Sequence, residues 1–145
     1  MLFRSSALGV YGASVITALT AQNTRAVTAV HEAPTDLIAA QLDAVLTDLD
    51  VDAIKIGMLS SIAIIETVAA ALRDCAIPVI LDPVMVAKSG DALLRDDAVA
   101  AVRELLVPKA TMLTPNLPEA ARLLDTQFAD DERQMQAQEI GRAHV

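Results

Sequence analysis

The chain has 145 residues, of which 54% are apolar and 2% are aromatic, and its formal net charge is −8. This length and apolar content predict one globular domain and exclude a disordered chain. The acidic balance argues against a nucleic-acid partner, because binding to a phosphate backbone needs a basic surface.

The single cysteine, Cys75, cannot form an internal disulfide bond, which is typical of a protein from a reducing compartment. We therefore expect a cytoplasmic protein. No stretch reaches the roughly 20 strongly apolar residues that a membrane-spanning helix needs, so no membrane partner is expected.

Short runs of β-branched residues alternate with helical patterns along the chain. They predict strands over residues 13–19, 27–33, 52–58, 77–82 and 110–114. Helices are expected after Pro34, after a capping Ser60 or Ser61, over 96–106, and within 115–125. This alternation predicts a single α/β domain with a mostly parallel central sheet and helices on both of its faces.

Polar or soft residues follow four of the predicted strands. Gln22 comes after the first strand, Met58 ends the third, Asp82 ends the fourth, and Thr114 ends the fifth. In open α/β sheets, ligands bind beyond the carboxyl ends of the strands. We therefore expect these four residues to converge on one edge.

Two of these strand ends allow both a structural and a functional interpretation. Asp82 precedes a proline, and Asp-Pro is a common start of a turn. Asn116 and Glu119 have the spacing of a helix capping box. A carboxylate beside a capped helix N-terminus also suits a Mg²⁺–phosphate group, since the helix end favours anions and the carboxylate can bind the metal.

Gln22 and Met58 are similarly ambiguous. A glutamine amide offers a paired donor and acceptor, which matches the edge of an aminopyrimidine ring, but it can also be a solvated loop residue. A lone methionine is most often part of the core. Lys88–Asp91 resembles a phosphate loop only loosely.

Four segments together resemble the hydroxymethylpyrimidine/phosphomethylpyrimidine kinases of thiamine biosynthesis, which belong to the ribokinase-like superfamily. They are ALGVYGASVITALTAQNT (7–24), KIGML (55–59), VILDPVMVAKSGDALL (79–94) and LTPNLPEAARLL (113–124). The resemblance covers residues 7 to 126 and implies a ribokinase-like α/β fold, of which this chain is a partial domain.

The resemblance also implies a reaction and a site. The reaction is ATP- and Mg²⁺-dependent phosphorylation of 4-amino-5-hydroxymethyl-2-methylpyrimidine and then of its monophosphate. Gln22, Met58 and Val84 would bind the pyrimidine. Thr114, Asn116 and Glu119 would lie around the ATP phosphates, and Asp82 and Glu119 around the metal. A homodimer is implied for the full-length enzyme.

The chain departs from the family pattern at both ends. The Gly- and Ser-rich opening strand of the family is not found before Leu8. The KGGH-like strand and the GTGC-like loop, which carries the catalytic residue, are not found either, so we assign no catalytic residue. We expect an inactive, poorly stable fragment. Residues 1–5 and about 139–145 are interpreted as non-native, because one short oligonucleotide, read on opposite strands, can encode both ends.

Two other functions remain open from the sequence. Pyridoxal or pyridoxine kinases share the Asp-Pro-Val and Thr-Pro-Asn patterns, whereas the AQNT and GML segments favour the pyrimidine enzyme. The second alternative is a non-catalytic α/β module that binds a nucleotide.

Overall fold

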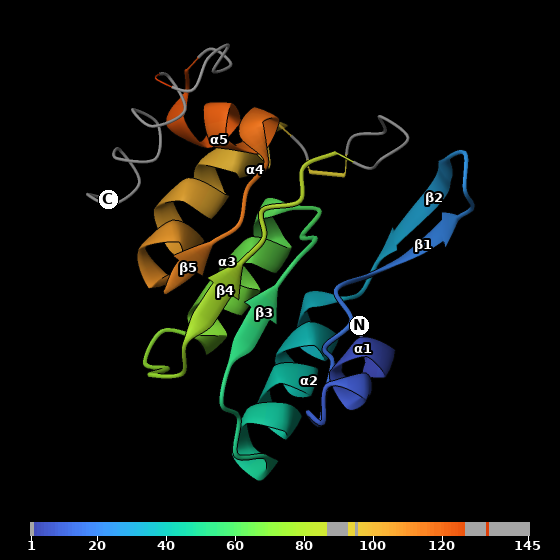
Figure 1. The fold of residues 1–145 in the computed structure, drawn as a ribbon, viewed down its shortest axis with the longest axis vertical. Coiled ribbons are helices and arrows are strands. Elements are labelled where there is room, and N and C mark those ends of the chain that lie inside the picture. Colours follow the sequence, from blue (N-terminus) through green and yellow to red (C-terminus); the bar gives the residue numbers. More distant parts are fainter. Residues whose placement is uncertain (1, 87–92, 95, 127–132, 134–145) are drawn as a thin grey trace.

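A computed structural model describes residues 2–86, 93–94, 96–126 and 133 (Figure 1). The N-terminal half contains α1 (Leu2–Ala7), β1 (Ala18–Gln22), β2 (Val27–Glu32), α2 (Thr35–Asp48), β3 (Ile54–Ile56) and α3 (Ile62–Ala71). It is followed by β4 (Val79–Leu81), α4 (Asp96–Ala101), η1 (Val102–Leu106), η2 (Val107–Lys109), β5 (Met112–Leu113) and α5 (Leu117–Leu124).

The strands form two separate sheets. β3, β4 and β5 make a parallel sheet in that order, with Ile56 opposite Leu81 and Leu81 opposite Leu113. Parallel neighbours need crossover connections, and helices α3 and α4 lie within them. The α/β class with a parallel sheet and packed helices is therefore confirmed.

One face of the parallel sheet packs against the helices. Ile56, Val79 and Leu81 are buried in the same core cluster as Ile64 and Ile65 of α3. α3 also packs against α2, α4 and η1, so it is the central helix of this layer. The β-branched and leucine side chains fill the space between sheet and helices, and burying them is the main source of stability.

The other face of the parallel sheet is more open. Side chains alternate between faces along a strand, so Lys55, Ile80 and Met112, which are opposite one another in register, share this second face. Lys55 is exposed, Ile80 is half-buried, and Met112 is 57% exposed.

The first two strands form an antiparallel hairpin that projects from the rest of the structure (Figure 1). The predicted strand over 13–19 is therefore displaced, because residues 13–17 lead into β1 without strand pairing. In the turn of the hairpin, the side chain of Asn23 accepts hydrogen bonds from the backbone N–H groups of Arg25 (2.8 Å) and Ala26 (3.0 Å). An asparagine that bonds its own following backbone is a turn former.

Two predicted helices differ in detail, and a third is confirmed. Residues 96–106 are predicted as one helix, but the structure has α4 followed by the π-helical turn η1, and the 3-10 turn η2 comes next. Ser61 occupies the N-cap position of α3, yet its hydroxyl donates to Glu32 Oε2 (3.1 Å) and caps no backbone group. The helix after Pro34 is confirmed as α2.

None of the helices in the described ranges is both long enough and apolar enough to cross a lipid bilayer.

Candidate functional site

The carboxyl ends of β3, β4 and β5 meet at one edge of the parallel sheet. The backbone N–H of Asp82 donates to Ile56 O (2.9 Å), and that of Thr114 donates to Leu81 O (3.0 Å). The hydrogen-bond ladder thus continues one residue beyond β4 and β5. Three of the four predicted strand ends, those leading to Met58, Asp82 and Thr114, therefore lie together.

Asp82 forms an ion pair at this edge. Its Oδ2 is 2.6 Å from Nζ of Lys55 on the neighbouring strand β3, and the two side chains are 32% and 42% exposed. Lys55 was missed as a site residue from the sequence. A signal was available, because a charged residue interrupts the otherwise apolar run of this strand.

The chain turns sharply after Asp82. The N–H of Val84 donates to Asp82 O (2.8 Å), a three-residue turn centred on Pro83, whose fixed φ suits this geometry. Val84 is half-buried and Met85 is fully buried. The Asp-Pro turn expected from the sequence is therefore present, and it places Asp82 where the chain leaves the sheet.

Asn116 and Glu119 form the capping box of α5. The N–H of Glu119 donates to Asn116 Oδ1 (2.9 Å), and the N–H of Asn116 donates to Glu119 Oε2 (2.9 Å). The other carboxylate oxygen, Oε1, accepts from the N–H of Met85 (3.3 Å). The structural interpretation of this pair is thus confirmed. Glu119 is only 5% exposed, so it links the turn after β4 to the start of α5.

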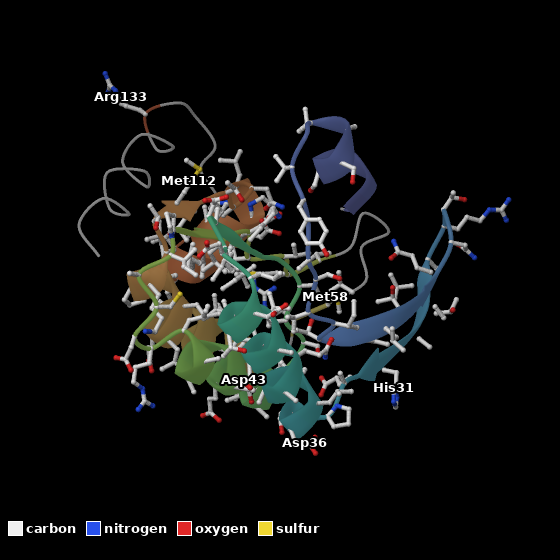
Figure 2. The ribbon with its side chains drawn as sticks, turned by 90° about the horizontal axis from the view of Figure 1, so that it is seen from below. His31, Asp36, Asp43, Met58, Met112 and Arg133 are labelled. Atoms are coloured by element: carbon white, nitrogen blue, oxygen red, sulfur yellow. The ribbon has the colours of Figure 1, made fainter. Side chains whose placement is uncertain are left out.

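Met58 lies where β3 leads toward α3, and it is half-buried. Its backbone oxygen accepts a hydrogen bond from Thr17 Oγ1 (3.1 Å), which ties it to the segment before β1. Figure 2 shows Met58 close to the base of the hairpin. His31 points outward from the hairpin in the same view and is exposed.

Gln22 is not brought to the edge of the parallel sheet. It ends β1 in the antiparallel hairpin and is exposed. The expectation that all four strand ends converge on one sheet is wrong for this strand, because β1 pairs with β2 and not with the parallel sheet. Lys88–Asp91 lies outside the described residues.

The carboxylate oxygens at the sheet edge would suit a magnesium ion that is bound together with substrate phosphates. Within the part of the chain that the structure describes, no group of three or more His, Cys, Asp or Glu side chains gathers to hold a metal. Mg²⁺ is commonly bound by one or two carboxylates together with substrate phosphates and water. Asp82 is accessible for this role, whereas both oxygens of Glu119 already accept backbone hydrogen bonds.

Comparison with known proteins gives consistent results. The family model described as phosphomethylpyrimidine kinase matches residues 4–143. A hydroxymethylpyrimidine/phosphomethylpyrimidine kinase from Rhizobium meliloti is 57% identical over 133 residues, which cover 92% of this chain and 50% of the relative. The chain thus spans about half the length of the curated relatives it matches.

Solved structures are similar as well. A crystal structure of phosphomethylpyrimidine kinase from Clostridium difficile matches with a TM-score of 0.90 and 38% identity, over 99% of this chain and 62% of that one. An ADP complex of Bacillus subtilis pyridoxal kinase matches with a TM-score of 0.76 and 35% identity, over 89% of this chain and 49% of that one. These neighbours confirm the ribokinase-like fold. The chain belongs to the phosphomethylpyrimidine kinase family.

Proposed function

We propose that this chain is the part of a thiamine-biosynthetic kinase that carries one half of the substrate and MgATP site. The reaction is transfer of the ATP γ-phosphoryl group to the hydroxymethyl oxygen of 4-amino-5-hydroxymethyl-2-methylpyrimidine, and then to the phosphate of the product. The 57% identity to a relative of that name, together with Asp82 lying beside the capped helix α5, carries the proposal.

The proposed phosphate and metal site lies at the carboxyl edge of the parallel sheet. Asp82 binds Mg²⁺ directly or through water, and the ion neutralises the charge of the ATP phosphates. Thr114 and Asn116 lie beside the phosphates near the N-terminus of α5, whose backbone dipoles favour anions. Glu119 is the second proposed metal residue. Its carboxylate also accepts hydrogen bonds from the backbone N–H groups of Met85 and Asn116, which links the turn after β4 to the start of α5.

The proposed pyrimidine site combines Gln22, Met58 and Val84. The amide of Gln22 would donate to and accept from the edge of the aminopyrimidine, and Met58 and Val84 would pack against the ring. These contacts lie away from the transferred phosphoryl group and hold the substrate equally before and during the reaction, so losing one should raise the Michaelis constant for the pyrimidine more than it lowers kcat.

The function is tested in a chimera that joins this chain to the remaining half of the Rhizobium meliloti relative. We expect the chimera to phosphorylate the hydroxymethylpyrimidine, and Asp82→Asn to reduce kcat by about 100-fold or more, since electrostatic stabilisation of the transferring group is lost. Asp43→Asn, on the exposed side of α2, is the matched control and should leave the rate unchanged. A folded chimera without ATP turnover would favour the non-catalytic nucleotide-binding module.

Pyridoxal phosphorylation is the second candidate function. It is favoured by one observation, the similarity to pyridoxal kinase structures with TM-scores of 0.76 to 0.80. The chimera distinguishes the two, because pyridoxal added in competition should not slow phosphorylation of the pyrimidine. A lower Michaelis constant for pyridoxal than for the pyrimidine would reverse the assignment.

We further propose that the complete enzyme is a cytoplasmic homodimer and that this chain alone is inactive. The inactivity follows from the family resemblance, because the loop that carries the catalytic residue has no counterpart in this sequence.

A further inference from the structure

Lys55 is the one charged residue within the three strands of the parallel sheet. Its side chain emerges on the open face of the sheet, beside Ile80 and on the same face as Met112. A lysine in the middle of a short apolar strand adds nothing to the core, since the core lies on the opposite face. Its position therefore calls for a reason other than packing.

Strand register explains why Lys55 reaches Asp82. Lys55 in β3 is opposite Ile80 in β4, and Asp82 lies two residues after Ile80. The side chains of Lys55 and Asp82 therefore project from the same face of the sheet. Diagonal neighbours of this kind are about 7–8 Å apart at the backbone, which a lysine side chain spans. The observed separation of 2.6 Å between Nζ and Oδ2 is a direct charge-assisted hydrogen bond.

The pair is too exposed to matter much for stability. Both side chains are accessible to water, and ion pairs of this kind contribute little to the free energy of unfolding. What the pair does fix is the direction of the carboxylate. Oδ2 is held by Lys55, and the other oxygen accepts no hydrogen bond from the described residues.

We propose, on the basis of the proposed function, that Lys55 is a positioning residue that makes metal binding at Asp82 depend on the nucleotide. The ammonium group repels a free divalent cation close to it and attracts the phosphates of a bound nucleotide. Mg²⁺ alone therefore binds Asp82 weakly, and Mg²⁺ carried by ATP binds more tightly. Lys55 acts through the orientation and charge of Asp82 and takes no part in bond making.

The test measures Mn²⁺ binding by electron paramagnetic resonance, with and without ATP, in the chimera with the remaining half of the Rhizobium meliloti relative, whose unsubstituted form is the wild type. Lys55→Met keeps the length of the side chain and removes its charge. We expect Lys55→Met to tighten binding of Mn²⁺ alone and to weaken binding of Mn²⁺·ATP, each by about 3- to 10-fold for one removed charge at this exposure. Lys55→Arg retains the charge and should behave as the wild-type chain does.

Two further variants separate a positioning role from a structural one. Lys109→Met removes the same charge from a lysine that bonds the carbonyl groups of Leu72 and Arg73, and it should move neither affinity. In the double variant Lys55→Met/Asp82→Asn, binding of Mn²⁺ alone should equal that of Asp82→Asn, because the effect of Lys55 passes through the carboxylate.

The outcomes are distinct. Opposite shifts in the two affinities support the proposal, and shifts in the same direction, or none, overturn it. If Asp82→Asn weakens Mn²⁺·ATP binding while Lys55→Met changes nothing, the proposed function stands and only the role of Lys55 is wrong. If the wild-type chain and Asp82→Asn bind Mn²⁺·ATP equally, the metal site of the proposed function fails, and the role of Lys55 fails with it.

Discussion

The two carboxylates near the sheet edge, Asp82 and Glu119, have different surroundings and therefore differ in how easily they can bind a new partner. Asp82 is partly exposed, and one of its oxygens is paired with the partly exposed ammonium group of Lys55, so water and ions can compete for it. Glu119 is buried. Its two carboxylate oxygens accept hydrogen bonds from the backbone N–H groups of Met85 and Asn116, and its own N–H donates to the side chain of Asn116. A buried carboxylate that accepts backbone hydrogen bonds is costly to alter, because removing its charge weakens bonds that nothing replaces.

The substitution Glu119→Gln tests this difference at the residue scale. Glutamine retains one acceptor oxygen but cannot accept from both Met85 and Asn116, so we expect the free energy of unfolding to fall by about 1–2 kcal/mol. Urea denaturation followed by circular dichroism measures the change. Glu66→Gln, on the exposed side of α3, is the matched control and should change stability little. Equal losses in the two variants would contradict the structural role of Glu119.

At the scale of elements, the hairpin differs from the rest of the fold. Its strands are exposed along almost their whole length, and Leu19 is 62% exposed. It is attached at its base, where Gln41 of α2 exchanges two hydrogen bonds with the backbone of Ile16 and Glu32 bonds Ser61. A two-stranded ribbon with little buried surface is marginal in water. The hairpin should therefore open locally without unfolding the parallel sheet.

The substitution Asn23→Ala tests the turn that closes the hairpin. Two hydrogen bonds to the backbone of Arg25 and Ala26 are lost, so amide protection should drop in β1 and β2 and stay unchanged in β4. Hydrogen exchange followed by NMR gives both readings in one experiment. Thr24→Ala, in the same loop, is the control. A uniform loss of protection across the chain would show that the hairpin does not open independently.

At the scale of the whole molecule, several large apolar side chains of the described residues are exposed. Tyr11 is 84% exposed, Leu8 81% and Met112 57%, and they come from the N-terminal segment and the open sheet face. Large apolar side chains are normally covered by another part of a protein when they lie close together on a surface. Among the described residues, β3 and β5 are the edge strands of the parallel sheet, and the outer edge of a sheet presents backbone groups that can pair with another strand.

We expect the isolated chain to be poorly stable and inactive. It should bind the dye 8-anilinonaphthalene-1-sulfonate, unfold over a broad temperature range, and show no ATP-dependent phosphorylation of the pyrimidine. Calorimetry, dye fluorescence and a coupled ADP assay measure these properties, with the full-length Rhizobium meliloti relative as the positive control. A sharp, cooperative thermal transition together with measurable turnover would contradict the expectation.

Local sequence patterns predicted most of the elements in the parallel part of the fold. β-branched runs located β3, β4 and β5, and the Asn116–Glu119 spacing predicted the capping box that forms. These features are determined by residues close together in the chain and are therefore predictable from the sequence. The position of the first strand is not predictable from its own residues, because its pairing with β2 involves the turn at Asn23, whose side-chain bonds do not show in the strand pattern.

The candidate site was only partly predictable for a similar reason. Asp82 and Thr114 were placed correctly at one edge, because strand ends of a parallel sheet meet there. The ion pair with Lys55 depends on register between β3 and β4, and register is not visible in either strand alone. The third contact of Glu119, with Met85, joins residues 34 apart and depends on the completed crossover between them.

That long-range contact couples two parts of the chain that are far apart in sequence. Glu119 accepts from Met85 and so links the turn after Asp82 to the start of α5. We therefore expect the turn at Pro83 and the last helix to gain or lose their structure together. A ligand that binds at Asp82 would therefore protect amides of α5 from exchange, even though the helix follows it by more than 30 residues in the chain.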